Sequence, residues 1–316
     1  MRSLSFSKLA NFTEDQAREY LESIRWSNGV VCPHCKSTGA SKFNPVQRKN
    51  RKPQNGLYRC TNKPCNKQFT VTVGTVCEGS HIPLNKWLMA MSLLCSSKKG
   101  MSAHQLHRML GVTYKTAWFM AHRIRHAMTQ DLSEKKFAGI VEIDEGYIGA
   151  KAIGKTGRGA TDKAKVVVLV ERDGRVKSEI VDKVTSVNLK EVLKKNVSKQ
   201  ATLYTDGFYP YRRVGREFNR HIAIIGTKEG VGPRRSIHIN TAENFIGILK
   251  RGIGGVYQHV SKKHLDKYLA EFDFRYSMRD IQDNERTTMA MLGIEGKRLY
   301  YKEGVNGREE KEEGKR

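Results

Sequence analysis

The chain has 316 residues, which is enough for about two domains of ordinary size and a small accessory module. Lysine and arginine number 57 against 32 aspartates and glutamates, so the formal net charge is +25. This excess favours a polyanionic partner such as nucleic acid, but it does not name an activity. The N-terminal part lacks the apolar run of ~7 to 15 residues that a signal peptide needs, and the longest later run, 166–170, is too short to cross a bilayer. We therefore expect a cytoplasmic protein.

Four of the six cysteines form two short pairs. The pairs are Cys32-Pro-His-Cys35 and Cys60-Thr-Asn-Lys-Pro-Cys65. In a reducing compartment such pairs are usually metal ligands, and two of them can place four thiolates around one structural Zn²⁺. The surrounding segment has too little apolar mass for a core of its own, so metal binding should supply much of its folding energy. We predict an N-terminal helix and a zinc ribbon within residues 1–82, and we expect Cys77 and Cys95 to pack in cores.

A helical region is expected over residues 83–132. The apolar segment 84–96 predicts a buried helix, and 101–110 and 114–128 predict two further helices around a turn at Gly111. This order is typical of a helix-turn-helix DNA-binding motif. An ordinary helical hairpin with a solvated basic face is the alternative. The side chains that we expect to meet phosphates or base edges are Lys115, His122, Arg123 and Arg125.

Residues 133–297 alternate between strand and helix patterns. Strands are predicted at 139–148, 165–172, 176–184, 201–205 and 221–225, and helices near 188–196, shortly after 206 and from 241. The order βββαβαβα is that of the RNase H fold, whose mixed sheet brings the ends of its first and fourth strands side by side. The predicted fold class is therefore α/β, an RNase H-like domain preceded by a zinc ribbon and a helix-turn-helix. The charged tail 298–316 is expected to be disordered.

Three acidic residues occupy particular places in this order. Asp144 lies within the first strand between apolar neighbours, where a carboxylate is costly to bury without a cation or donors. Asp206 ends the fourth strand, and Glu243 lies in the first turn of the last helix. Three carboxylates that converge from different elements can hold two Mg²⁺ or Mn²⁺ ions about 3.5 to 4 Å apart, which is the arrangement for phosphodiester chemistry.

Each acid also has a structural interpretation. Glu142 shares a strand face with Asp144 by alternation and could be the ligand instead, whereas Glu145 should point away. Asp206, in Thr-Asp-Gly, could be a turn residue. Glu243 could pair with an Asn240 cap in a capping box.

Residues 149–156 satisfy the G-x4-G-K-[ST] phosphate-loop pattern. A phosphate loop runs directly into a helix, but the residues that follow here are glycine-rich and then strand-like. We therefore favour a basic hairpin tip over an ATP site, and we expect its Lys155 and Arg158 to contact the DNA backbone.

Several stretches resemble a known family, the ISXO-type insertion-sequence transposases, which are similar to eukaryotic Merlin transposases. The resemblance runs from about residue 15 to residue 280 and rests on VEIDEGYIGAK, LYTDGFYPY, HINTAENFIGILKRGIGGVYQHVSKKHLDKYLAEFDFRY and the cysteine-containing segment before them. It implies a DDE transposase whose catalytic carboxylates are Asp144, Asp206 and Glu243, with Lys250 at a trailing basic position. Some members carry Asn as the third catalytic residue, so Asn240 and Asn244 remain alternatives to Glu243, and Cys77 stands where an aromatic is expected.

The resemblance implies a protein that binds terminal inverted repeats, cuts DNA with Mg²⁺ and joins the freed ends to target double-stranded DNA. Arg251, beside Lys250, is a further candidate for DNA contact. Because two ends must be joined, we expect a homodimer or larger assembly, associated with the nucleoid in a prokaryote. A non-enzymatic zinc-ribbon and helix-turn-helix regulator, or an RNase H-like nuclease without strand transfer, remains an alternative.

Overall fold

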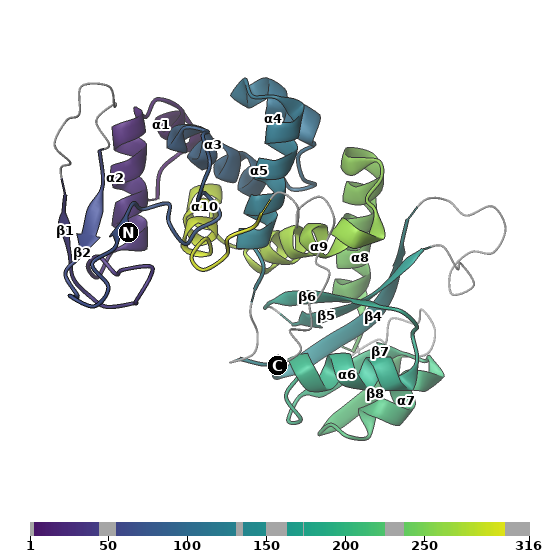
Figure 1. Ribbon diagram of the computed structural model, residues 1–316. Coiled ribbons are helices and arrows are strands. Elements are labelled where there is room, and N and C mark those ends of the chain that lie inside the picture. Colours follow the sequence, from purple (N-terminus) through teal and green to yellow (C-terminus); the bar gives the residue numbers. More distant parts are fainter. Residues whose placement is uncertain are drawn as a thin grey trace, which may run out of the picture. The chain divides into compact units, whose positions relative to one another are not determined.

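The computed structural model describes residues 3–43, 55–130, 135–149, 163–172, 174–224 and 237–300. The chain divides into two compact units (Figure 1). The first comprises Met1–Met128 and Ile281–Arg316, and the second comprises Thr129–Asp280. The predicted boundary at residue 297 differs from this division, because α10 (Asp283–Leu292) packs on α2 (Glu14–Arg25) and α3 (Leu84–Ser96) of the first unit. The ribbon and the helical region, predicted as separate domains, lie in this same unit.

The first unit combines a small antiparallel sheet with helices. Its remaining elements are α1 (Phe6–Ala10), β1 (Ala40–Lys42), β2 (Tyr58–Cys60), β3 (Gln68–Phe69), α4 (Ala103–Leu110) and α5 (Tyr114–Ala127). The sheet order is β1-β2-β3. The helix predicted at 84–96 is confirmed as α3, and α4 starts after a Ser102 cap that accepts a hydrogen bond from the Gln105 amide. Gly111 ends α4 in the left-handed conformation (φ 59°), which a glycine adopts without strain.

Helix α10 is fixed to α3 by a buried arginine. The Arg286 guanidinium donates to the Cys95 carbonyl oxygen (3.1 Å) and to Asp283 Oδ1 (2.7 Å). Cys95 is buried, as expected for a cysteine that packs in a core. Cys77, the other cysteine outside the two short pairs, is buried as well. The C-terminal helix therefore completes a core that begins near the N-terminus.

The second unit has the RNase H-like fold. Its elements are β4 (Ile140–Ile148), β5 (Ala164–Glu171), β6 (Val176–Val181), α6 (Ser186–Asn196), β7 (Thr202–Asp206), α7 (Tyr209–Gly215), β8 (Arg220–Ile224), α8 (Asn240–Gly252), the π-helix η3 (Ile253–Tyr257) and α9 (Lys262–Ser277). The sheet order is β6-β5-β4-β7-β8, with β4 antiparallel to β5 and parallel to β7. The predicted order of strands and helices is thus confirmed.

Alternation along β4 sends its side chains to two different cores. Val141 and Ile143 lie in the core that also contains residues of α6 and α7, whereas Ile148 lies in the core shared with α8 and α9. A Cβ on Gly146 would lie 3.3 Å from Ile246, so a glycine here lets α8 approach the strand closely. The face of β4 that meets α8 therefore also carries Glu142 and Asp144.

Glu142 anchors the start of α8. Its side chain is fully buried and accepts hydrogen bonds from the Arg172 guanidinium (2.7 Å) and from the backbone N–H groups of Thr241 (2.9 Å) and Ala242 (3.2 Å). A carboxylate at a helix N-terminus satisfies free N–H groups and complements the helix dipole. The alternative in which Glu142 is the metal ligand is therefore wrong, because both of its oxygens are engaged. The capping-box alternative is also wrong, since Ile239 is the N-cap and makes no side-chain hydrogen bond.

We expect Glu142→Ala to lower the free energy of unfolding by about 3 to 5 kcal/mol, the usual cost of removing one partner of a buried ion pair. The loss leaves Arg172 and the first turn of α8 without their acceptor. Urea unfolding measures it, with Glu217→Ala as the control, because Glu217 forms an ion pair with Lys190 in which both side chains are exposed. Equal unfolding midpoints for the two variants would contradict this role of Glu142.

Candidate active site and metal centre

The four paired cysteines come together in one cluster. Their sulfur atoms all lie within 4.8 Å of one another, at 3.8 Å for Cys32 and Cys65 and 3.6 Å for Cys35 and Cys60. Zn–S bonds of ~2.3 Å in a tetrahedron require sulfur separations of about 3.8 Å. None of these cysteines is in a disulfide. The four predicted ligands therefore lie close enough together to hold one structural Zn²⁺.

Two similar turns hold the sulfur atoms in place. The residue after each pair, Lys36 (φ 61°) and Asn66 (φ 43°), has a positive φ that reverses the chain. The Ser37 hydroxyl, 3.1 Å from the Cys35 sulfur, lowers the pKa of the Cys35 thiol to about 6. Because the thiolate is the form that binds metal, this contact favours zinc binding at neutral pH.

The basic residues of α5 do not share one environment. Lys115, in the first turn, is exposed. His122, Arg123 and Arg125 are buried, with exposed fractions of 0%, 5% and 2%. The prediction that these three contact DNA is therefore wrong for this structure. α5 packs against α3, α4 and α10, and its C-terminal half is buried, whereas its first turn stays exposed.

Arg123 shows why a basic side chain is stable in this interior. Its guanidinium lies over the rings of Trp87 (5.5 Å) and Phe119 (5.3 Å) and donates to the Glu78 carbonyl oxygen at 2.5 Å. Stacking on aromatic faces and a carbonyl acceptor offset the loss of water around the charge. Burial nevertheless lowers the pKa of Arg123.

The first two predicted carboxylates lie on adjacent strands. The parallel register of β4 and β7 ends with Ile143 opposite Thr205, so the next residues along the two strands are Asp144 and Asp206. Adjacent strands are ~4.8 Å apart. Asp206 Oδ1 also accepts a hydrogen bond from the Phe208 amide (3.0 Å). One carboxylate oxygen of Asp206 therefore stabilises a turn, as the structural interpretation of this residue expected.

Glu243 approaches from α8, whose first turn is held by Glu142, two residues before Asp144. Burial raises the pKa of Asp144 to about 7, and the negative charges of Glu145, Asp206 and Glu243 act in the same direction. The three predicted acids therefore lie close enough together for the charges of Asp206 and Glu243 to raise the pKa of Asp144. Glu145 itself points away as expected and accepts a hydrogen bond from the Tyr211 hydroxyl (2.9 Å).

The carboxylates do not surround a single point. In the described ranges, the four cysteines are the one group of three or more potential ligands whose donor atoms all lie within 4.8 Å of one another. A two-metal site has its outer ligands farther apart than this, because the ions themselves are about 3.5 to 4 Å apart. The donor set of hard carboxylate oxygens fits Mg²⁺ or Mn²⁺.

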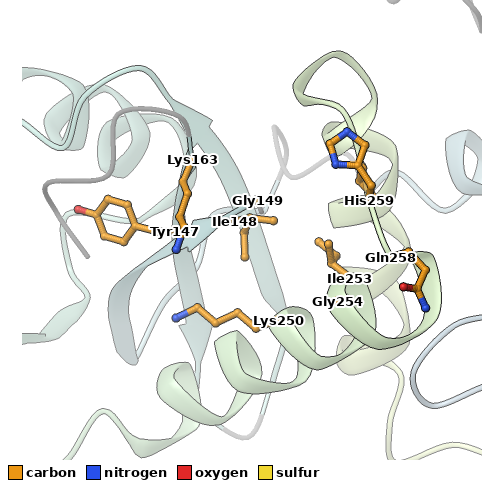
Figure 2. A pocket seen from close by; sticks show the side chains of 10 residues that line it. Tyr147, Ile148, Gly149, Lys163, Lys250, Ile253, Gly254, Gln258 and His259 are labelled. Atoms are coloured by element: carbon orange, nitrogen blue, oxygen red, sulfur yellow. The ribbon is translucent and has the colours of Figure 1, made fainter. Parts of the chain in front are cut away.

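A cavity of about 480 Å³ lies beyond the carboxylates, between the end of β4 and the end of α8. Lys250 and Lys163 are among the residues that line it (Figure 2). Arg251 is exposed on the same helix. Lys155 and Arg158 lie outside the described residues, as does most of the phosphate-loop pattern, whose flanking strands β4 and β5 pair as antiparallel neighbours.

Sequence reasoning missed two residues that position the site. Glu142 was weighed only as a ligand, although an acid at an inward-facing strand position can equally cap a helix. Gly146 gave a weak signal, a glycine inside a strand, which often marks a close approach of backbone.

Comparisons with known proteins identify the family of the chain. Residues 136–277 match the family described as ISXO2-like transposase domain, and residues 12–68 match the transposase zinc-ribbon domain. A protein of Halobacterium salinarum described as "Uncharacterized protein in transposable element ISH50" is 30% identical over 281 residues, which cover 83% of this chain and 90% of that protein. The chain belongs to the ISXO2-like transposases. The resemblance found in the sequence is confirmed, and the protein is an insertion-sequence transposase.

Solved structures of the Mos1 transposase are more distant from this ISXO2-like transposase. They include the "Mos1 Strand Transfer Complex" (13% identity, TM-score 0.28, 65% of this chain and 74% of that one) and the "Mos1 transposase paired-end complex with left transposon end" (14%, 0.29, 66% and 74%). Similarity at this level supports no conclusion about the site. No helix in the described part of the chain is both long enough and apolar enough to cross a membrane.

We expect the transposase to contain one zinc ion per chain, and Cys60→Ser to lose it, because three thiolates leave the tetrahedral site incomplete. Metal content by mass spectrometry measures the loss. Cys95→Ala is the matched control, since Cys95 is equally buried but lies outside the cluster. Zinc retained at full stoichiometry in Cys60→Ser would contradict the assignment.

Protons should compete with divalent ions for Asp144, whose pKa is about 7. The raised pKa means that the carboxyl is neutral below pH 7 and a weaker ligand there. We expect the apparent affinity for Mn²⁺ to fall about tenfold per pH unit below pH 7, as one proton is displaced, and to level off above about pH 8. Titration followed by electron paramagnetic resonance measures the affinity.

Asp273→Asn is the control for this pH dependence. Burial also raises the pKa of Asp273 to about 7, but its carboxylate is hydrogen-bonded to the backbone N–H and the hydroxyl of Ser178. This variant should keep the pH profile of Mn²⁺ binding, whereas Asp144→Asn should lose the binding. A Mn²⁺ affinity that is constant from pH 5.5 to pH 7.5 would refute the assignment of Asp144 as a ligand.

Proposed function

We propose that this transposase is a DDE enzyme that cuts and joins DNA strands at a two-metal site formed by Asp144, Asp206 and Glu243. The observation that carries the proposal is the register of β4 and β7, which makes Asp144 and Asp206 neighbours at the point where the parallel pairing of the two strands ends. The raised pKa of Asp144 supports it, because a buried carboxylate with acidic neighbours is stabilised by a bound cation.

The chemistry is phosphoryl transfer without a covalent enzyme intermediate. Two bound Mg²⁺ ions would activate the attacking oxygen and stabilise the leaving oxygen. Water attacks a phosphodiester at the end of the element, which leaves a free 3′-hydroxyl and a 5′-phosphate. The 3′-hydroxyl then attacks a phosphodiester of the target strand, so that one P–O bond forms as another breaks. Lys250 and Arg251 lie on the same helix as Glu243 and would hold phosphates of the bound strand.

The third ligand is proposed to be Glu243 and not Asn240 or Asn244. All three side chains are exposed on the first turns of α8, so exposure does not separate them. Glu243 is, however, the only one of the three that carries a charge, and this charge contributes to the raised pKa of Asp144. A carboxylate is also the stronger ligand for a hard divalent cation.

Unit 1 is proposed to bind the terminal inverted repeats through its zinc ribbon and helix-turn-helix. Residues at the start of a recognition helix contact base edges, and Lys115 is exposed in the first turn of α5. The side chains of Lys155, Arg158 and Arg251 in the second unit would add phosphate contacts. Joining two ends requires two copies of the site, so we propose a homodimer or larger assembly on DNA.

Asp144→Ala and Asp206→Ala should each reduce Mg²⁺-dependent nicking and strand transfer about a thousandfold or more, because each loss removes several kcal/mol of stabilisation by the metal ions. The assay uses duplexes that carry the inverted repeats flanking this reading frame, and separates nicked from joined products on a denaturing gel. Nicked product without joined product would identify a nuclease instead.

Three further variants complete this test. Glu191→Ala removes an exposed carboxylate from α6, on the opposite face of the sheet, and should keep full activity. Glu243→Gln should be inactive while Asn244→Ala remains active. The reverse result would assign the third ligand position to the asparagine, and activity in Asp144→Ala would refute the proposed site.

A further inference from the structure

Helix α7 presents an aromatic ring and three arginines on one exposed face. Tyr209 is 73% exposed, the highest fraction among the large hydrophobic side chains of the described residues. With three exposed arginines it forms the α7 stripe, which consists of Tyr209, Arg212, Arg213 and Arg216. These positions fall within an arc of about 100° around the helix axis, because each residue turns a helix by about 100°. The other side of α7 carries Tyr211 and Val214, which are buried in the core shared with α6.

The arginines of the α7 stripe lack the acidic partners that the lysines of α6 have. Lys190 and Lys194 both pair with Glu217, at 2.5 and 3.7 Å. Lys195 pairs with Glu179 at 3.0 Å. In the described ranges, no carboxylate pairs with an arginine of the α7 stripe. A solvated surface usually mixes both signs of charge, so an unpaired positive stripe that ends in an aromatic ring indicates a nucleic-acid strand as its partner.

The α7 stripe begins next to the proposed catalytic site. Tyr209 lies three residues after Asp206, and the Phe208 amide holds the turn between them by its hydrogen bond to Asp206. Because β8 runs parallel to β7, α7 leads back from the end of β7 and the stripe runs away from the carboxylates. From Tyr209 to Arg216 the helix rises about 10 Å at 1.5 Å per residue. This length corresponds to about three base steps of 3.4 Å along a DNA strand.

Helices α7 and α8 lie on opposite faces of the sheet (Figure 1). α7 packs in the core shared with α6, and α8 packs in the core shared with α9. Lys250 and Arg251 of α8 are proposed above to hold the strand of the element end. A second DNA segment that enters the same site from the other face of the sheet meets α7.

Target DNA needs such a contact more than the element end does. The end duplex is held at a distance from the carboxylates by sequence-specific contacts of unit 1 with its repeats, as proposed above. The target has no fixed sequence, so its binding depends on contacts with phosphates and base faces near the site of attack. The α7 stripe offers both kinds of contact.

We propose that the α7 stripe binds the target DNA during strand transfer, a proposal that rests on the function proposed above. Its arginines hold successive phosphates of the target strand, and the Tyr209 ring stacks on a base beside the attacked phosphodiester. Neither contact reads a sequence, which suits a partner that differs from one insertion to the next. The stripe positions the target and takes no part in making or breaking bonds.

The salt dependence of target binding tests the arginines. Each phosphate contact that is lost reduces the slope of log affinity against log salt concentration by about 0.9. The full-length chain is assembled on an end duplex without added Mg²⁺, and a fluorescent duplex without repeats is then titrated as the target. We expect a variant with Arg212→Gln, Arg213→Gln and Arg216→Gln to reduce the slope by about 2 to 3.

The matched control carries Lys190→Gln, Lys194→Gln and Lys195→Gln. It removes the same total charge from the neighbouring helix, but these lysines already have acidic partners. The control should change the slope by less than about 1. Equal changes for the two triple variants would overturn the proposal. All six side chains are exposed, so both proteins should fold.

Photo-crosslinking tests the position of Tyr209 and separates two sources of DNA. In one arm, 5-iodo-2′-deoxyuridine replaces thymidine in the target duplex. In the other arm, it replaces thymidine in the DNA that flanks the element end. We expect the target duplex to crosslink to the peptide that contains Tyr209. A stronger crosslink from the flanking DNA, or none from either arm, would overturn the proposal.

Strand transfer from pre-cut ends tests the stacked base. Tyr209→Ser should raise the KM for target DNA at least about fivefold, the lower limit for loss of one base–aromatic stack, and Tyr209→Phe should keep it within about twofold. No described residue forms a hydrogen bond with the Tyr209 side chain, so neither variant should disturb the fold. Equal KM values for the two variants would count against the stack.

Binding and joining together separate this proposal from the function on which it rests. If the wild type joins DNA but the two triple variants have the same salt slope, the proposal for α7 alone is refuted. If the arginine variant lowers the slope as expected but the wild type joins no DNA with Mg²⁺, the catalytic proposal alone is refuted.

Discussion

One face of strand β4 determines the geometry of the proposed active site. Three alternate residues on this face have different tasks: Glu142 binds the first turn of α8, Asp144 faces the proposed metal ions, and Gly146 lets α8 come close to the strand. Because strand periodicity fixes their spacing, the helix that carries Glu243 is held by the same few residues that present Asp144. The catalytic geometry therefore does not depend on a loop.

The acids of β4 differ in their surroundings, and these surroundings separate the structural role of Glu142 from the catalytic role proposed for Asp144. Glu142 is saturated by hydrogen bonds from protein groups, and Glu145 is paired with Tyr211. Asp144 is also largely enclosed, but among the described residues only the neighbouring Glu145 amide donates a hydrogen bond to its side chain. Its raised pKa expresses the cost of ionising a carboxylate without compensating donors, and a bound cation would remove that cost.

The order and type of the elements could be predicted from the sequence, because period-two and period-3.6 patterns depend on which side chains are buried. The cysteine cluster was predictable for a similar reason, since four ligands at short spacing have few other uses. The basic residues of α5 were assigned wrongly, because a stripe of arginines on a helix looks the same whether it faces solvent or, like Arg123, stacks on Trp87. The roles of Glu142 and α10 depend on contacts between residues about 100 to 190 positions apart, which no local pattern encodes.

The return of α10 to the first unit means that the RNase H-like unit is inserted within another unit, not attached after it. The chain passes between the two units twice, so a single proteolytic cut at either crossing leaves them covalently connected. During synthesis, the surface of α3 that packs on α10 has no partner until roughly 190 further residues have been made. At usual ribosomal rates this takes on the order of 10 to 40 seconds. The N-terminal unit can therefore reach its final packing only after the inserted unit has been completely translated.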